Sequence, residues 1–220
     1  MKADVKINNP KSGVILKILE ESYPEAECEL NFGTPFQLLV AVVLSAQCTD
    51  KRVNAVTRTL FKDYPTPEAF NALDTEILEK LIYTCGFYRN KAKAIKLLSE
   101  DIAQKFGGEV PSTVEGLMSL AGVGRKTANV VYSVAFGGEA IAVDTHVFRV
   151  SHRLGLSNGN TPDKVMEDLM REFPSDKWYA LHHAMIFHGR YTCKSRKPDC
   201  GNCRLTKYCV YYADMTDKKD

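Results

Sequence analysis

The sequence has no long hydrophobic run. Its longest apolar stretch, residues 38–44, is far shorter than the roughly 20 residues that a membrane-spanning helix needs. The first residues, Met1 to Lys6, are not followed by the apolar segment of a signal peptide. These absences exclude the common membrane-spanning and secreted classes. We therefore expect an intracellular, cytoplasmic protein that does not use a membrane.

The chain also has little net charge. Its 29 Lys and Arg residues are almost balanced by 27 Asp and Glu residues, which gives +2 at neutral pH. Any contact with nucleic acid must therefore come from local clusters of positive charge. The two clusters are Arg89, Lys91, Lys93 and Lys96, and Arg190, Lys194, Arg196, Lys197, Arg204 and Lys207. A basic cluster alone is more typical of a solvated face than of a DNA site, so these residues do not define a function by themselves.

Segments in which apolar and polar residues alternate are missing as well, so nothing predicts a β-strand. Helix signals recur instead. The candidate helix starts share a capping side chain and are Ser12, Thr34, Thr66, Ser112 and Thr161. The candidate helix ends share a glycine expected in the left-handed conformation and are Gly86, Gly137 and Gly189. We predict an all-α fold of about ten helices, with the apolar helix after Thr34 buried.

A disulfide framework is not indicated, because the seven cysteines are odd in number and no signal peptide is recognised. Three of them are scattered along the chain. The other four fall within 17 positions and are Cys193, Cys200, Cys203 and Cys209. Four thiolates in one compact loop predict a metal centre. Zinc and a [4Fe–4S] cluster both take four thiolates in a tetrahedral arrangement, and the spacing alone slightly favours zinc.

A glycine-rich turn, residues 120–128, joins two predicted helices as a tight hairpin. Gly122 and Gly124 are expected to take positive φ and to leave backbone N–H groups uncovered, which would bind a phosphate. The simpler interpretation is a short turn with no ligand. Lys126 favours the first interpretation. In the first turn of a helix it feels the positive end of the dipole, which disfavours its protonated form and makes a nucleophilic amine more accessible.

Asp144 follows the apolar segment Ile141-Ala142-Val143 and precedes another helical pattern. It is a natural N-cap. It is also a candidate catalytic carboxylate that stabilises a growing positive charge and handles protons at Lys126. The two interpretations are compatible. The 18 positions between Lys126 and Asp144 permit a contact but do not require one.

Taken together, the hairpin, the Val143-Asp144-Thr145-His146 segment and the cysteine spacing resemble the endonuclease III family of helix-hairpin-helix DNA glycosylases, over nearly the whole chain. The resemblance implies a [4Fe–4S] cluster on the four cysteines, in place of zinc. It also implies two helical domains flanking a DNA-binding cleft. One is a six-helix barrel with the helix-hairpin-helix, about residues 28–138, and the other combines residues 1–27 and 139–220 and carries the cluster.

The resemblance further implies base excision repair by a bifunctional DNA glycosylase and AP lyase. Lys126 matches the Schiff-base nucleophile and Asp144 the catalytic carboxylate. The enzyme would remove an oxidised pyrimidine that has been flipped out of the duplex, and would then cleave the strand 3′ to the abasic site by β-elimination.

The expected partner is double-stranded DNA that contains damaged bases or abasic sites, bound by a monomer associated with the nucleoid. Gln47 matches the residue that fills the gap left by the flipped nucleotide, and Phe87 matches an apolar wedge opposite it. The full set of residues expected to contact DNA is Gln47, Phe87, Gly122, Gly124, Arg125, His146 and Lys197.

Two positions depart from the family pattern. Ala121 replaces a usual proline, which would loosen the entry to the hairpin, and Cys48 follows Gln47 where another small residue is commoner. Rival hypotheses explain less of the sequence. An adenine glycosylase would carry a glutamate at Val42 and no lysine at 126. A DNA-binding module leaves Lys126 and Asp144 unexplained, and an electron carrier leaves the hairpin unexplained.

Overall fold

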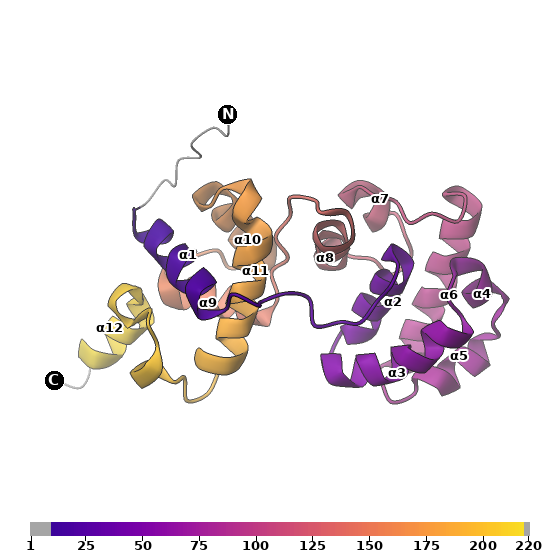
Figure 1. Ribbon diagram of the computed structural model, residues 1–220, viewed down its shortest axis with the longest axis horizontal. Helices are drawn as coiled ribbons and strands as arrows, with labels where there is room; N and C mark the ends of the chain where they lie inside the picture. Colours follow the sequence, from indigo (N-terminus) through magenta and orange to yellow (C-terminus); the bar gives the residue numbers. More distant parts are fainter. Residues whose placement is uncertain (1–9, 218–220) are drawn as a thin grey trace. The chain divides into compact units, whose positions relative to one another are not determined.

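A computed structural model describes residues 10–217, and every regular element in this part of the chain is helical (Figure 1). The predicted all-α fold is confirmed. The helices group into two compact units. One unit consists of two segments, which end at Cys28 and begin at Glu139, and the other is the continuous segment Glu29–Gly138. None of the helices described is long and apolar enough to cross a membrane.

The unit Glu29–Gly138 is built around a buried helix. Its elements are α2 (Pro35–Ser45), α3 (Asp50–Asp63), α4 (Pro67–Ala72), α5 (Thr75–Ile82), α6 (Tyr88–Lys105), α7 (Val114–Met118) and α8 (Arg125–Phe136). As expected, α2 is the core helix: eight of its 11 residues are buried. It packs against α3, α6 and α8, so the apolar sequence of α2 fixes the helices that carry the hairpin.

Threonine caps begin the helices where the Thr-Pro signals predict them. The hydroxyls of Thr34, Thr66 and Thr161 accept hydrogen bonds from backbone N–H groups in the first turns of their helices. The two predicted serine caps are wrong. Ser12 lies inside α1 (Pro10–Ser22), where its hydroxyl donates to the carboxylate of Glu172. Helix α7 is capped by Thr113, one residue after Ser112, because the Thr113 hydroxyl accepts from Gly116 N at 3.1 Å.

Only one of the three predicted glycine ends is confirmed. Gly137 ends α8 in the left-handed conformation, with φ of 64°. Gly86 is not left-handed, because α5 has already ended at Ile82 and Phe87 supplies the left-handed residue. Gly189 lies inside a continuing π-helical turn. A Cβ there would lie 2.7 Å from Cβ of His146, so this glycine permits a close approach of two segments.

The other unit is organised around α9. Its remaining elements are α1, α10 (Pro162–Glu172), η1 (Ser175–Lys177), α11 (Trp178–Phe187), η2 (His188–Thr192), η3 (Cys200–Asn202), η4 (Thr206–Tyr208) and α12 (Val210–Asp217). Helix α9 (Thr145–Leu154) contacts α10, α11, α12 and η2. Its buried Val147, Val150 and Leu154 join Ile15 of α1 and Leu181 of α11 in one apolar core. Any residue at either end of α9 is therefore held by this core.

A buried histidine in α11 gives this unit a pH-dependent stability. Burial lowers the pKa of His183 to about 3, and electrostatic interactions with His182 and Arg190 act in the same direction. Above the unfolded pKa of about 6.5 the residue is neutral in both states, and stability is highest. As the pH falls below 6.5, His183 binds a proton in the unfolded chain but not in the folded chain, so the free energy of unfolding decreases.

We expect the titration of His183 to lower the free energy of unfolding of the wild type by about 2 kcal/mol when the pH is lowered from 7 to 5. Urea unfolding at the two pH values, with wild type and His183→Gln compared, measures the effect. The variant should show the smaller difference, since the other titrating groups are unchanged. An equal difference in both proteins would show that His183 does not titrate in this way.

Candidate functional site

The hairpin that joins α7 to α8 depends on one of its two glycines for its conformation. Gly122 has φ of 73°, and a Cβ there would lie 2.7 Å from Cβ of Ala94 on α6. Both facts require glycine. The expected positive φ at Gly124 is wrong: this residue is the N-cap of α8, with φ of −87°. A Cβ at Gly124 would meet nothing within 4 Å, and no side chain caps the first turn of α8 in the described structure. The backbone at the start of α8 is therefore accessible.

Ala121 anchors the entry to the hairpin. Its N–H donates to Oδ2 of Asp101 on α6 at 3.3 Å, a bond that proline could not make. The carboxylate is in turn paired with Lys105 at 2.6 Å. The hydrogen bond from Lys105 lowers the pKa of Asp101, so the acceptor stays ionised. A looser turn was expected at Ala121, but its N–H attaches the turn to α6 through Asp101.

Lys126 is the second residue of α8 and its side chain is exposed. Arg125 beside it is exposed too. The core contact of α8 with α2 holds the start of this helix, while the lysine amine faces solvent. The predicted nucleophile therefore lies next to the open backbone of Gly124.

Gln47 and Phe87 lie at the tips of two loops and are both exposed; Phe87 keeps 64% of its surface in solvent. Both residues have left-handed backbones, with φ of 54° and 58°. The conformation is unfavourable for side chains of this size and persists only where the surrounding structure imposes it. The Gln47 loop is residues 45–49, and the Phe87 loop is residues 83–87.

Lys91 holds the backbone just before Gln47, and the sequence did not reveal this role. Its side chain is buried, and its Nζ donates to the carbonyls of Leu44 and Ala46 at 2.8 and 2.7 Å. Burial lowers the pKa of Lys91. The ammonium thus satisfies carbonyls at the C-terminal end of α2 and fixes the loop that follows.

The basic cluster around Lys91 is not a solvated face as a whole. Lys96 donates to the carbonyls of Phe70, Asn71 and Leu73 at the end of α4. Arg89 lies 3.8 Å from Glu79. Lys93 is exposed.

Replacing Lys91 with methionine is expected to lower the free energy of unfolding by about 1–3 kcal/mol, because the two carbonyls lose a charged donor. Chemical denaturation of the variant measures the loss. Lys93→Met is the matched control, because it removes an exposed lysine from the same helix. Equal stability of the two variants would contradict the structural role of Lys91.

Asp144, in the other unit, is the N-cap of α9. Its Oδ1 accepts hydrogen bonds from the backbone N–H groups of His146 and Val147, both at 2.8 Å. Because both bonds end on Oδ1, the cap does not use Oδ2. The carboxylate is half-buried and is therefore fixed in position while one oxygen remains for another task.

Helix α9 also holds the cysteine loop, defined as residues 193–209. Arg149 donates to the carbonyls of Cys193 and Gly189 at 3.0 and 2.9 Å, and its Nη2 lies 3.2 Å from Nδ1 of His146. One turn later, Arg153 Nη1 lies 3.3 Å from the Cys193 sulfur and its guanidinium stacks on Tyr211. The predicted carboxylate and the predicted metal loop are therefore attached to the same helix.

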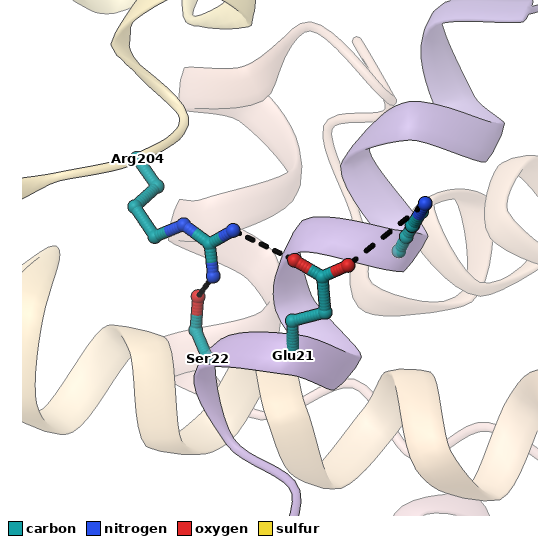
Figure 2. Close-up of polar contacts among 4 residues, drawn as sticks. Glu21, Ser22 and Arg204 are labelled. Atoms are coloured by element: carbon teal, nitrogen blue, oxygen red, sulfur yellow. Dashed lines mark hydrogen bonds and ion pairs between the residues drawn. The ribbon is translucent and has the colours of Figure 1, made fainter.

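The far part of the cysteine loop is tied to α1. Figure 2 shows Arg204 donating to the Glu21 carboxylate at 2.7 Å and to the Ser22 hydroxyl at 3.4 Å. The other carboxylate oxygen of Glu21 lies 4.0 Å from Lys17. An acidic partner from outside the loop, Glu21, therefore pairs with one of its basic residues. Lys197 is exposed and has φ of 52°.

All four cysteines of the loop line a single small pocket. Burial raises the pKa of the thiols of Cys200, Cys203 and Cys209. In the part of the chain that the structure describes, no three His, Cys, Asp or Glu side chains form a group able to hold one metal ion. The four sulfurs thus surround a space.

Comparisons with known proteins agree with this architecture. The family model described as the HhH-GPD superfamily of base excision DNA repair proteins matches residues 40–175. Endonuclease III of Bacillus subtilis is 53% identical over 86% of this chain and 87% of its own length. Endonuclease III of Escherichia coli K12 is 44% identical over 93% of this chain and 97% of its own length.

Solved structures lead to the same class. A trapped endonuclease III–DNA covalent intermediate matches with a TM-score of 0.90 and 47% identity, covering 94% of this chain and 99% of that chain. A thermostable thymine-DNA glycosylase shares the fold at 24% identity, with a TM-score of 0.86. These matches define a helix-hairpin-helix protein of base excision repair. Within that class, the chain belongs to the endonuclease III family.

Proposed function

We propose that this protein is a base excision repair DNA glycosylase and AP lyase that acts on oxidised pyrimidines in double-stranded DNA. The observation that carries the proposal is an exposed lysine, Lys126, at the start of the hairpin helix α8. The family supports it, because a relative 47% identical has been trapped as a covalent intermediate with DNA. A lysine amine is a suitable nucleophile for such an intermediate.

The hairpin would hold the DNA backbone next to this lysine. Gly124 leaves its face open, and the uncapped first turn of α8 presents N–H groups at the positive end of a helix dipole. A phosphate held there contacts backbone atoms, so the contact reads no sequence. Gly122, Gly124 and Arg125 are thus proposed to position the strand. Sequence-independent docking suits an enzyme that must find damage at any position.

Backbone strain supports the other proposed DNA contacts. Within residues 10–217, the non-glycine residues with positive φ are Gln47, Phe87 and Lys197. All three belong to the set expected to contact DNA, and all three are exposed. Unfavourable backbones of this kind collect at functional sites. We assign Gln47 and Phe87 to filling the space left by the flipped nucleotide, and Lys197 and His146 to contacts with the strand.

In the proposed reaction, the Lys126 amine attacks C1′ of the sugar and displaces the damaged base. The nitrogen then forms an imine with C1′ as the C1′–O4′ bond of the sugar ring breaks; O4′ becomes a hydroxyl group, taking up a proton as the nitrogen gives one up. The imine makes the proton on the adjacent carbon acidic, and its loss expels the 3′ phosphate by β-elimination. The Asp144 carboxylate, fixed by its cap, is proposed to stabilise the positive charge that grows on the sugar as the base leaves.

The cysteine loop fits the [4Fe–4S] cluster that the family resemblance implies. Such a cluster takes one thiolate per iron, so its ligands surround a space and do not meet at a point. Cys193, Cys200, Cys203 and Cys209 are placed around one cavity in this way. When bound, the cluster would cross-link the loop and so fix the basic residues near it.

In this proposal the helix-hairpin-helix barrel is residues 28–138, and the cluster domain is residues 1–27 with 139–220. The protein would act as a monomer on duplex DNA and would therefore be found with the chromosome.

The function is tested with two labelled duplexes that are identical except for one thymine glycol. We expect cleavage 3′ to the lesion and no cleavage of the undamaged duplex. If the damaged base is released but the strand is not cleaved, the lyase part of the proposal is wrong. If cluster-loaded protein reacts with neither duplex, the whole proposal is wrong.

A further inference from the structure

The Gln47 loop and the Phe87 loop lie against each other within the unit Glu29–Gly138. A Cβ at Gly86 would lie 3.6 Å from the Gln47 carbonyl oxygen. Arg52, in α3, donates to the Thr84 carbonyl at 3.2 Å, and Lys91 donates to the carbonyls on either side of Ser45. Each loop also contains a cysteine, Cys48 in one and Cys85 in the other.

These two cysteines face each other across the contact. The two thiols are near enough to influence each other electrostatically, and neither takes part in a disulfide. Cys85 is fully buried, whereas Cys48 is half-buried. Two cations, Lys91 and Arg52, lie close enough to act on the pair electrostatically. The catalytic scheme uses neither thiol.

We infer that Cys48 and Cys85 are a peroxide-sensitive dithiol whose oxidation cross-links the two loops. In the first step a hydroperoxide transfers one oxygen to the Cys48 sulfur, which gives a sulfenic acid and releases an alcohol or water. In the second step the Cys85 sulfur attacks the Cys48 sulfur, a disulfide forms, and the oxygen leaves as water. The thiols lose two electrons and two protons, and the peroxide gains them.

The order of the two steps follows from exposure. Cys48 reaches the surface and meets the oxidant first, while Cys85 is shielded and reacts only with its neighbour. Burial raises the pKa of Cys85 to about 11; the Cys48 thiol adds to the increase, while Lys91 and Arg52 act against it. Cys85 therefore stays protonated near neutral pH and does not react with the peroxide first; it attacks the Cys48 sulfenic acid after its thiol has given up its proton to water.

The effect of the cross-link on DNA cleavage rests on the proposed function. A disulfide holds its two sulfurs only about 2 Å apart, closer than any non-bonded contact, so its formation draws the loops together. Gln47 precedes Cys48 directly, and Phe87 lies two residues after Cys85. Small displacements of positioning residues slow catalysis strongly, and we expect about a tenfold slower cleavage in the oxidised protein.

The cross-link is detected in the full-length, cluster-loaded protein. After treatment with a small excess of hydrogen peroxide, free thiols are blocked with N-ethylmaleimide and the protein is digested with trypsin without reductant. We expect a disulfide-linked pair of peptides, residues 81–89 and 18–51. Because the second peptide also contains Cys28, the matched control is Cys28→Ser, which should give the same pair.

Neither Cys48→Ala nor Cys85→Ala should give the linked peptides. Their cleavage rates should not fall tenfold on treatment, whereas the wild-type rate should fall and recover with dithiothreitol. Circular dichroism and iron content check that the variants are folded and loaded. The inference is overturned if peroxide leaves both wild-type thiols free or converts Cys48 to a sulfinic acid. If the disulfide forms but the oxidised protein cleaves DNA as fast as the reduced protein, the regulatory role is overturned. If the reduced protein does not cleave DNA at all, the proposed function is contradicted, while the inference about the disulfide stands.

Discussion

Replacing Lys126 with alanine should abolish the covalent adduct that borohydride traps between the protein and a duplex containing one abasic site. The reduction captures the imine between the lysine nitrogen and C1′, so an adduct requires the amine. Strand cleavage should fall by at least about 10³-fold, or about 4 kcal/mol of transition-state stabilisation. The adduct is measured as a shifted band on a denaturing gel.

Lys126→Arg is the matched control for this experiment. Arginine keeps the positive charge at the start of α8 but stays protonated, so it cannot serve as the nucleophile. We expect no adduct from this variant, while its binding to duplex DNA and the salt dependence of that binding stay close to wild type. A trapped adduct in either variant would assign the nucleophile to another residue and remove Lys126 from the mechanism.

Local signals in the sequence predicted the fold well because they act within a few residues. A threonine hydroxyl needs only the next turn of its own helix, so Thr34, Thr66 and Thr161 were recognisable as caps. The uninterrupted apolar sequence of α2 could be stable only in a core. Where a tertiary contact decides, the prediction failed: Ser12 bonds Glu172, and Gly189 is needed for the approach of His146.

The supporting residues of the candidate site were not predictable for the same reason. Lys91 stands among other basic residues, and nothing in the sequence distinguishes a buried lysine from its exposed neighbour Lys93. Its role depends on carbonyls more than 40 positions earlier in the chain. Arg149 and Arg153 offered a weak signal, since residues four apart share a helix face, but their acceptors lie in the separate cysteine loop.

Local sequence signals indicated the hairpin glycines, Lys126, Asp144 and the four cysteines, whereas Gln47 and Phe87 came from the family resemblance. The structure adds a physical reason for some of these residues. Gly122 is required by its φ and by Ala94. Gln47, Phe87 and Lys197 hold unfavourable backbones on the surface. Gly124 has no such requirement, because its conformation is open to other residues. Its value would lie in the uncovered backbone at the start of α8, which a side chain would obstruct.

Replacing Cys209 with serine should cause loss of the cluster. The cysteine loop should then become less ordered. A serine hydroxyl stays protonated at neutral pH and is a poor substitute for a thiolate ligand. Because binding of a structural metal centre contributes directly to folding, its loss should destabilise the unit that contains α9 by several kcal/mol. The readouts are iron content and the thermal unfolding midpoint.

Limited trypsin digestion gives this prediction a local readout. The cysteine loop contains Lys194, Arg196, Arg204 and Lys207, which are exposed cleavage sites. Arg149, Arg153 and the Arg204–Glu21 pair hold only parts of the loop, so without the cluster we expect faster cleavage there than in the wild type. Cys28→Ser is the matched control, because Cys28 lies outside the loop; it should keep its iron and its resistance. A Cys209→Ser protein with four irons and wild-type resistance would refute the ligand assignment, since a hydroxyl cannot replace the thiolate without some loss of both.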